Sequence, residues 1–379
     1  MRLPKFEYLE PKSLKEAAKA LAIDPSGSAL LAGGTDLLVN MKHRVIQPRR
    51  VINLKAIPKL AYISDGKDGL RIGTLTTLHD LASSRVIKER YPALNQAAKE
   101  VGAYAHQVMG TLGGNLCQGN RCRYYNQSVF WRGARPPCHK AGGELCHVVR
   151  KQKQCHSTYC GDLAPVLIAL DSRIKVMGPD GERSFPLKRL YTQNGKKPLS
   201  MKKGEILKEI IVPSPSGKTL YLKWRLRDSL EFPVVSLALH IEKGRDERIN
   251  PSTPRSEGWG LPSTPNSGEL SRAAQVEGLR VDPERHVLSR PEGQGLDAIE
   301  RVKKGRIIFS AVGPGPVETA EAKKILKGAS LDDQLIEKIS NQAIKAISPM
   351  RTSIHSPAYK RKMAGILLQQ GLTEIMNAK

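Results

Sequence analysis

The chain alternates between segments with helical periodicity and short apolar runs that are typical of strands. Residues 12–22 carry apolar side chains at helical spacing, and Ser13 stands where an N-cap is expected. Residues 28–31 and 50–54 are apolar runs that predict two short strands around a glycine turn. This pattern predicts a small α/β subdomain that ends near Lys55.

Two further regions follow the first subdomain. Residues 56 to about 216 contain alternating strands such as Leu70–Ile72 and Arg173–Met177, which predict a second subdomain. From about residue 218 the strands come first and the helices last, which predicts an antiparallel sheet with helices. The strands expected there are Leu220–Arg225, Val234–Glu242 and Arg306–Val312, and the helices are 317–327, 331–346 and 357–370. The expected division of the chain is 1–55, 56–216 and 218–379.

Residues 245–302 differ from the rest of the chain in composition. They hold six prolines together with many Ser, Gly and Arg residues. Such a segment cannot bury much apolar surface, so we expect a flexible insert between two strands. A regulatory or partner-binding segment is the alternative interpretation.

All six cysteines lie in one window of 44 residues, 117–160, and the other 335 residues contain none. Zinc ribbons and fingers usually pair two close cysteine couples, whereas here isolated cysteines separate the two couples. A [4Fe–4S] cluster needs four thiolates and tolerates ligands from a long loop, so it fits better. Zinc in a stabilising loop is the alternative. The histidines that follow cysteines, His139, His147 and His156, are interpreted as loop residues rather than ligands.

The net charge of the cysteine window favours the binding of a negatively charged group. It holds eight Arg and Lys residues against Glu144 alone, a net charge of +7. The whole chain carries a net charge of +25, and binding to nucleic acid is one interpretation of that charge. The basic residues are spread along the chain and form no block, so a solvated basic surface, or a face for acidic partner proteins, is favoured.

The ends and the apolar runs of the chain bear on its location. The N-terminus has no apolar core of a secretory signal, and no run of 18 apolar residues exists. We therefore expect a cytoplasmic protein without a membrane span. Its thiols would stay reduced, which disfavours disulfides and favours metal ligation.

Two glycine motifs, residues 30–37 and 110–115, are candidates for binding phosphate. Paired glycines let the backbone approach a phosphate closely and point successive N–H groups at it. The first motif alone is a weak signal, because it lacks the spacing of a Rossmann turn and of a P-loop. Together, the two motifs could hold one pyrophosphate from two sides. Asp36 follows the paired glycines of the first motif, and Asp162 follows the cysteine window.

The chain resembles the FAD-binding medium subunit of the molybdenum hydroxylases, the group of xanthine dehydrogenase and carbon monoxide dehydrogenase. The segments that carry the resemblance are 30–44, 70–82, 110–115, 161–170, 221–240, 307–316 and 359–363. Nearly the whole chain is covered, apart from the cysteine window and the insert. The window, through residues 114–122 and 124–128, is similar to the extra [4Fe–4S] loop in the flavin subunit of 4-hydroxybenzoyl-CoA reductase.

The resemblance implies the fold and the site residues. The implied fold is α+β: a two-subdomain FAD-binding fold of the PCMH type, then a C-terminal antiparallel sheet with helices, as in CO dehydrogenase flavoproteins. The implied FAD contacts are Ala32, Gly33, Gly34, Thr35, Asp36, Leu37, Thr111, Gly113, Gly114, Asn115, Asp162 and Lys223. The implied cluster ligands are Cys122, Cys138, Cys146 and Cys155, which leaves Cys117 and Cys160 as bystanders. Spacing alone does not separate four ligands from six candidates.

The function implied is electron transfer. FAD would exchange electrons with a [2Fe–2S] partner subunit connected to a molybdenum-cofactor subunit, and the [4Fe–4S] cluster would add a port for a ferredoxin-like carrier. No catalytic nucleophile or general base is expected in this chain, because the cofactors supply the redox chemistry. Two alternatives remain open. One is a flavin subunit that uses NAD(H) directly, and the other is a zinc-bearing nucleic-acid-binding protein.

Overall fold

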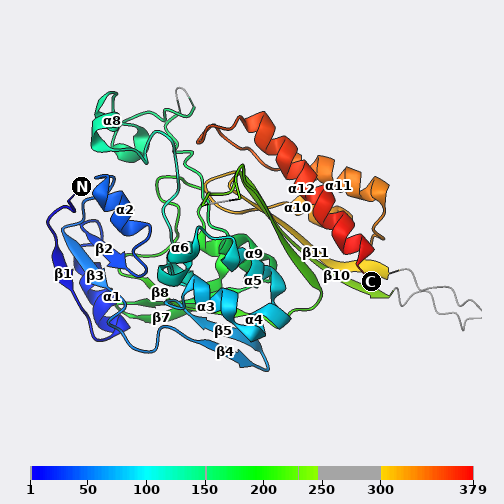
Figure 1. Cartoon of the computed structure of the whole chain (residues 1–379), viewed down its shortest axis with the longest axis horizontal. Helices are drawn as coiled ribbons and strands as arrows, with labels where there is room; N and C mark the ends of the chain where they lie inside the picture. Colours follow the sequence, from blue (N-terminus) through cyan, green and yellow to red (C-terminus); the bar gives the residue numbers. More distant parts are fainter. Residues whose placement is uncertain (1, 150–151, 229, 246–299, 379) are drawn as a thin grey trace, which may run out of the picture. The chain divides into compact units, whose positions relative to one another are not determined.

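The computed structural model describes residues 2–149, 152–228, 230–245 and 300–378. The insert predicted at 245–302 therefore lies almost entirely outside the described residues. The flanking strands reach just into the expected range, since strand β10 runs to Arg245 and strand β11 begins at Glu300. Both strands continue past the predicted boundaries because they pair with each other in one sheet. Up to Gly244 and from Arg301 onward, the chain forms one compact unit (Figure 1).

The first sheet has three parallel strands in the order β1-β3-β2. Helix α1 (Leu14–Ile23) begins at the predicted cap, where the Ser13 hydroxyl accepts the N–H of Glu16 at 3.2 Å. Helix α2 (Leu37–Lys42) follows directly after the first glycine motif. The strands are β1 (Glu7–Leu9), β2 (Ser28–Leu31) and β3 (Arg50–Asn53).

The second sheet has five antiparallel strands in the order β4-β5-β8-β6-β7. Its strands are β4 (Ile63–Gly66), β5 (Gly69–Gly73), β6 (Arg173–Gly178), β7 (Gly181–Pro186) and β8 (Ile206–Val212). The helices of this region are α3 (Leu78–Ser83), α4 (Arg85–Arg90), α5 (Pro92–Lys99), α6 (Tyr104–Met109), α7 (Leu112–Leu116) and α9 (Leu163–Ala169), with 3₁₀ turn η2 at Leu187–Leu190.

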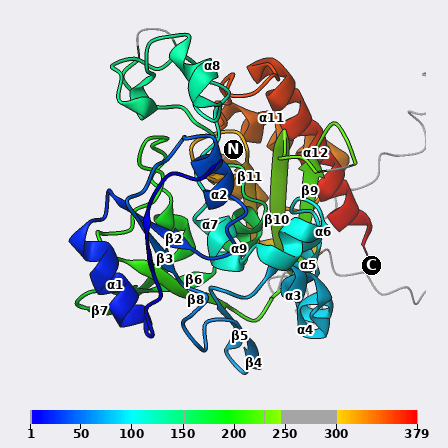
Figure 2. The same ribbon diagram turned by 60° about the vertical axis from the view of Figure 1, so that its left-hand side comes forward.

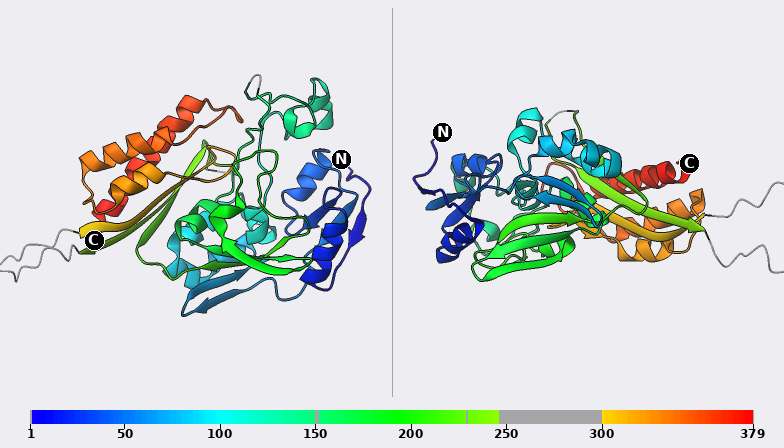
Figure 3. Two further views of the ribbon diagram at one scale, coloured as in Figure 1. Left: turned by 180° about the vertical axis from the view of Figure 1, so that it is seen from behind. Right: turned by 90° about the horizontal axis from the view of Figure 1, so that it is seen from below.

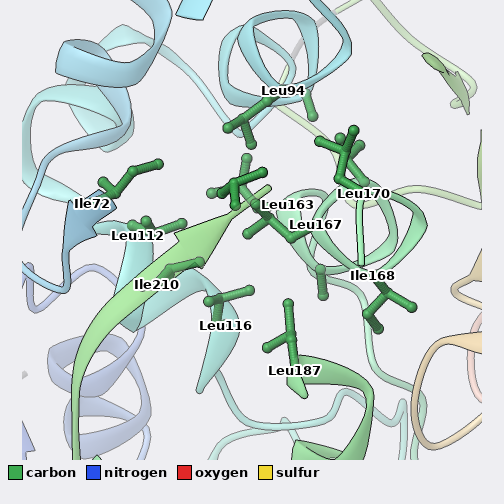
Figure 4. Close-up of a cluster of buried hydrophobic side chains, with 14 of the residues drawn as sticks. Ile72, Leu94, Leu112, Leu116, Leu163, Leu167, Ile168, Leu170, Leu187 and Ile210 are labelled. Carbon is green, nitrogen blue, oxygen red and sulfur yellow. The ribbon is translucent and has the colours of Figure 1, made fainter. Parts of the chain in front are cut away.

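Helix α9 is the centre of the largest apolar core. All of its residues are buried, so it has no polar face. Figure 4 shows Leu163 and Leu167 of this helix among side chains from β5, α5, α7 and β8, such as Ile72 and Ile210. Because α9 starts directly after Asp162, this packing holds Asp162 in a buried position.

The third sheet has the strand order β12-β11-β10-β9. Its strands are β9 (Lys218–Trp224), β10 (Val235–Arg245), β11 (Glu300–Ser310) and β12 (Val317–Glu318). The helices that follow are α10 (Ala320–Leu326), α11 (Asp333–Lys345) and α12 (Pro357–Asn377). Figure 3 shows these helices, in orange and red, beside the long strands of the sheet.

Helix α12 is longer than predicted. It continues past residue 370 because its apolar face stays buried through Leu372 and Ile375. Gly371 does not end the helix, since it lies against the side chains of Leu222 and Leu239 in the sheet. Among the described residues, no helix is long and apolar enough to cross a membrane.

The cysteine loop, residues 122–157, leaves the second subdomain and returns to the same point. Its base is closed by two backbone hydrogen bonds between Arg121 and Thr158, of 2.7 and 2.8 Å. It contains the short helix α8 (Val129–Gly133) and the 3₁₀ turn η1 (His139–Ala141). In Figure 2 the loop lies above α2. The Arg132 side chain in the loop donates to the carbonyl oxygen of Arg44 at 2.7 Å. The base of the loop is therefore fixed, and its outer part rests on the segment after α2.

Candidate functional site

Both glycine motifs line one large cavity of about 640 Å³. They approach each other through backbone atoms, because a Cβ at Gly33 would lie 2.3 Å from the carbonyl oxygen of Met109 and 2.8 Å from Cα of Gly110. Eleven of the twelve residues expected to bind FAD line this cavity. They are Ala32, Gly33, Gly34, Thr35, Asp36, Leu37, Thr111, Gly113, Gly114, Asn115 and Asp162.

The second motif is held by contacts on both sides. The Thr111 hydroxyl caps α7 by accepting the N–H of Gly114 at 3.1 Å. A Cβ at Gly113 would lie 1.9 Å from the hydroxyl of Thr74, so this backbone is pressed against the end of β5. The Asn115 side chain accepts the N–H of Leu163, at 3.3 Å, at the start of α9. The motif is thus rigid before any ligand arrives.

Lys223, the twelfth residue, is placed behind the cavity rather than on its wall. Its side chain is 1 % exposed and lies 3.2 Å from the carboxylate of Asp162. It also donates to the carbonyl oxygen of Glu100 at 2.7 Å, and the Tyr221 hydroxyl donates to Asp162 at 2.6 Å. Burial raises the pKa of Asp162, and the charge of Lys223 opposes that shift. Lys223 therefore acts on the cavity through Asp162.

A second, small cavity of about 10 Å³ lies within the cysteine loop. Cys122, Cys138, Cys146 and Cys155 all line it, whereas Cys117 and Cys160 line the large cavity. This division of the six cysteines is the same as the one implied by the resemblance. However, no three His, Cys, Asp or Glu side chains in the described part of the chain are close enough together to form a metal-binding group.

Four thiols and one ammonium group line the small cavity. Burial, with smaller contributions from the neighbouring thiols, raises the pKa of the Cys122 thiol to about 11. Binding to iron would therefore have to displace the proton of this thiol. The Lys140 ammonium lies in the wall and donates to the backbone oxygen of Asn120 at 3.2 Å and to the Ser157 hydroxyl at 3.3 Å. Four thiols beside a cation are the types of donor that an iron–sulfur cluster takes, but as they lie here they are not gathered closely enough to hold one. The cavity is too small for one as it stands, so its walls would have to move apart.

Family models match most of the chain. The model of the FAD-binding domain in molybdopterin dehydrogenase matches residues 4–215, and that of the CO dehydrogenase flavoprotein C-terminal domain matches residues 295–375. The chain belongs to the family of FAD-binding subunits of molybdopterin dehydrogenases. It is the flavin subunit of an oxidoreductase. We call the large cavity the flavin cavity, because eleven of the residues expected to bind FAD line it. The α+β fold expected for such a subunit is confirmed.

Individual relatives agree with this family. The chain is 29% identical over 289 residues to the FAD-binding subunit of an aldehyde oxidoreductase from Escherichia coli, covering 72% of this chain and 87% of the relative. It is 23% identical to the glyceraldehyde dehydrogenase medium chain of Sulfolobus acidocaldarius, covering 98% and 99%. The fold is similar to a structure of carbon monoxide dehydrogenase from Hydrogenophaga pseudoflava, with a TM-score of 0.70, 22% identity, and coverage of 99% and 98%.

Several residues of the flavin cavity were not expected from the sequence. Arg121 forms an ion pair with Asp36, and its guanidinium lies 4.9 Å from the centre of the Phe232 ring. Glu205 reaches the cavity from the loop before β8, and His106 from α6. His106 lies four residues before the second glycine motif and Arg121 six residues after it, so both had a local cue. Glu205 and Phe232 come from distant segments that no local pattern connects.

Proposed function

We propose that this flavin subunit passes electrons between FAD and a [4Fe–4S] cluster, as part of a complex with a molybdenum-cofactor subunit and a [2Fe–2S] subunit. The proposed cluster ligands are Cys122, Cys138, Cys146 and Cys155. One observation carries the proposal: these four line one cavity, and the two remaining cysteines line another. The partner subunits are proposed from the relatives, which are named as subunits and medium chains of larger enzymes.

The two cavities are neighbours along the chain. Arg121 lines the flavin cavity, and Cys122, the next residue, lines the cysteine cavity. Electron transfer between bound cofactors needs a short route, and a single peptide bond connects the two linings. This arrangement supports the cysteine loop as an electrical contact to the flavin.

The residues of this chain bind and shield, while FAD and the cluster supply the redox chemistry when bound. The glycine motifs offer backbone N–H groups to the FAD pyrophosphate. In the cysteine cavity, Tyr124 and Tyr125 form apolar walls that exclude water, and Lys140 provides a positive charge beside the thiols. A buried cation of this kind offsets the negative charge of four thiolates.

We further propose that the external carrier is an acidic, ferredoxin-like protein. The surface of the cysteine loop supports this, since Arg123 and Arg135 are exposed and Phe130 on α8 is 92 % exposed. Opposite charges steer association and aromatic side chains anchor interfaces. An aryl-CoA reductase such as 4-hydroxybenzoyl-CoA reductase is the complex we propose, because the sequence of the loop resembles that of its flavin subunit.

Iron analysis of cysteine variants tests the cluster. Purified full-length chain should contain FAD and about four iron atoms with acid-labile sulfide. The variants C138S and C146S should lose iron and keep FAD. C117S is the matched control, because its cysteine lines the other cavity, and it should keep iron. Unchanged iron in C138S, or a colourless protein with one zinc and salt-dependent DNA binding, would contradict the proposal.

Electron donors test the port. We expect a reduced ferredoxin to reduce the flavin, and R135A to slow that reaction at low salt. Rapid bleaching of the flavin by NADH, together with no reaction with ferredoxin, would instead favour a subunit that uses NAD(H) directly.

A further inference from the structure

The flavin cavity carries an excess of negative charge. Four carboxylates line it, and among the lining residues in the described part of the chain Arg121 is the only Arg or Lys. The carboxylates belong to Asp36, Asp162, Glu205 and Glu231. FAD brings a doubly anionic pyrophosphate into this cavity, so a nearby cation would strengthen the binding that the backbone N–H groups of the glycine motifs provide.

Three of the carboxylates are compensated by groups outside the cavity lining. Asp162 pairs with Lys223 at 3.2 Å, and Glu205 forms a bidentate pair with Arg183 at 2.5 and 2.7 Å. Glu231 accepts the backbone N–H of Leu226 at 2.9 Å and that of Arg227 at 3.1 Å. The fourth, Asp36, lies two residues after the paired glycines of the first motif. Its charged partner is Arg121, and it also accepts the Asn40 amide at 3.0 Å and the N–H of Gly119 at 3.4 Å.

Arg121 is held in place and has donors left over. One of its Nη atoms donates to Asp36, and the Phe232 ring lies beside the guanidinium. Its Nε is buried and has no hydrogen-bond partner, and the side chain as a whole is 23% exposed. A guanidinium has five N–H donors in one plane, which suits the oxygens of a phosphate better than an ammonium does.

We propose that Arg121 binds the pyrophosphate of FAD, so that the base of the cysteine loop forms part of the flavin site. Asp36 then orients the guanidinium and leaves its remaining donors for phosphate oxygens. The backbone of Arg121 pairs with Thr158 and closes the loop, so the loop and the bound flavin share one residue. The proposal rests on FAD binding by this family and does not require a cluster in the loop.

Arg121 lies where the flavin cavity and the cysteine cavity meet, at the base of the loop. It lowers the pKa of the Cys160 thiol, which lines the flavin cavity, though burial is the larger effect and raises that pKa to about 11. Cys122, the residue after Arg121, lines the cysteine cavity. Arg121 therefore lies at the boundary of the two cavities, where its charge can pair with a pyrophosphate in the flavin cavity.

FAD titrations of the purified full-length apoprotein at low and high salt test the proposal. We compare wild type, R121K and R121Q, with R351Q as the matched control, since Arg351 is exposed and lines neither cavity. R121Q should weaken FAD binding on the order of 10- to 100-fold at low salt, the loss expected for a charge-assisted hydrogen bond. R121K should lose less, and R351Q should bind like wild type.

The salt dependence separates an ionic contact from a structural role. Wild-type affinity should fall with added salt, and the affinity of R121Q should depend on salt much less. If R121Q does not fold, the charge-balanced variant D36N/R121Q leaves no unpaired carboxylate and should show the same weak, salt-insensitive binding. Wild-type affinity in R121Q, or a loss of affinity with the salt dependence unchanged, would overturn the proposal. Neither result would bear on the iron content of the loop.

Discussion

Replacing Gly33 by Ala should push apart the two loops that form the flavin cavity. The three nearest atoms to a Cβ at this position are backbone atoms of residues 109 and 110, at 2.3, 2.8 and 3.0 Å. Ordinary contacts begin at about 3.4 Å, so one loop must move by roughly 1 Å. No flexible side chain can absorb this displacement.

The expected loss follows from that displacement. Overpacking of this kind costs about 1–3 kcal/mol. Gly33 is not among the glycines with positive φ, so alanine meets no backbone strain there, and the clash alone sets the cost. If FAD binding is weakened by the same free energy, the affinity for FAD should fall by a factor of about 5–150.

Two measurements check this prediction: urea unfolding of the apoprotein and fluorescence titration with FAD. G133A is the matched control, because a Cβ at Gly133 in α8 would meet no atom within 4 Å. It should leave FAD affinity unchanged and should not lower stability. If G33A bound FAD within about twofold of wild type, the close contact between the loops would not be what shapes the cavity.

Two further predictions concern buried charges beside the cavity. K223M should lower the free energy of unfolding in urea by about 3–5 kcal/mol, because it leaves Asp162 buried without its cation. The double variant D162N/K223M should recover part of this loss. Equal stability of K223M and wild type would contradict the pairing. The hydrogen bond from Arg183 lowers the pKa of Glu205 below its usual 4.5. The stability that this carboxylate contributes is therefore present above pH 4.5, and it is lost as the pH falls through the lowered pKa. The difference in Tm between wild type and E205Q should therefore shrink on acidification from about pH 6 to about pH 3, and a difference independent of pH would refute the assignment.

Much of the fold could be predicted because its signals are local. The cap at Ser13, the apolar runs of β2 and β3, and the strands Leu70–Ile72 and Arg173–Met177 all match elements of the structure. The end of α12 could not be predicted in this way. It depends on the sheet against which Gly371 packs, and that sheet is built by strands far away in the sequence.

The sequence by itself determined the family and the two glycine motifs, and the resemblance predicted which four of the six cysteines are ligands. The glycine motifs depend on residue types at short spacing, where backbone freedom and helix capping act locally. Only the tertiary structure decided that Gly33 touches the loop at residues 109–110 and that Lys223 lies behind Asp162. It also decided that, within the part of the chain that the structure describes, no other Arg or Lys than Arg121 lines the flavin cavity. These contacts join segments separated by dozens of residues. Burial and charge pairing between such segments exist only once the chain has folded.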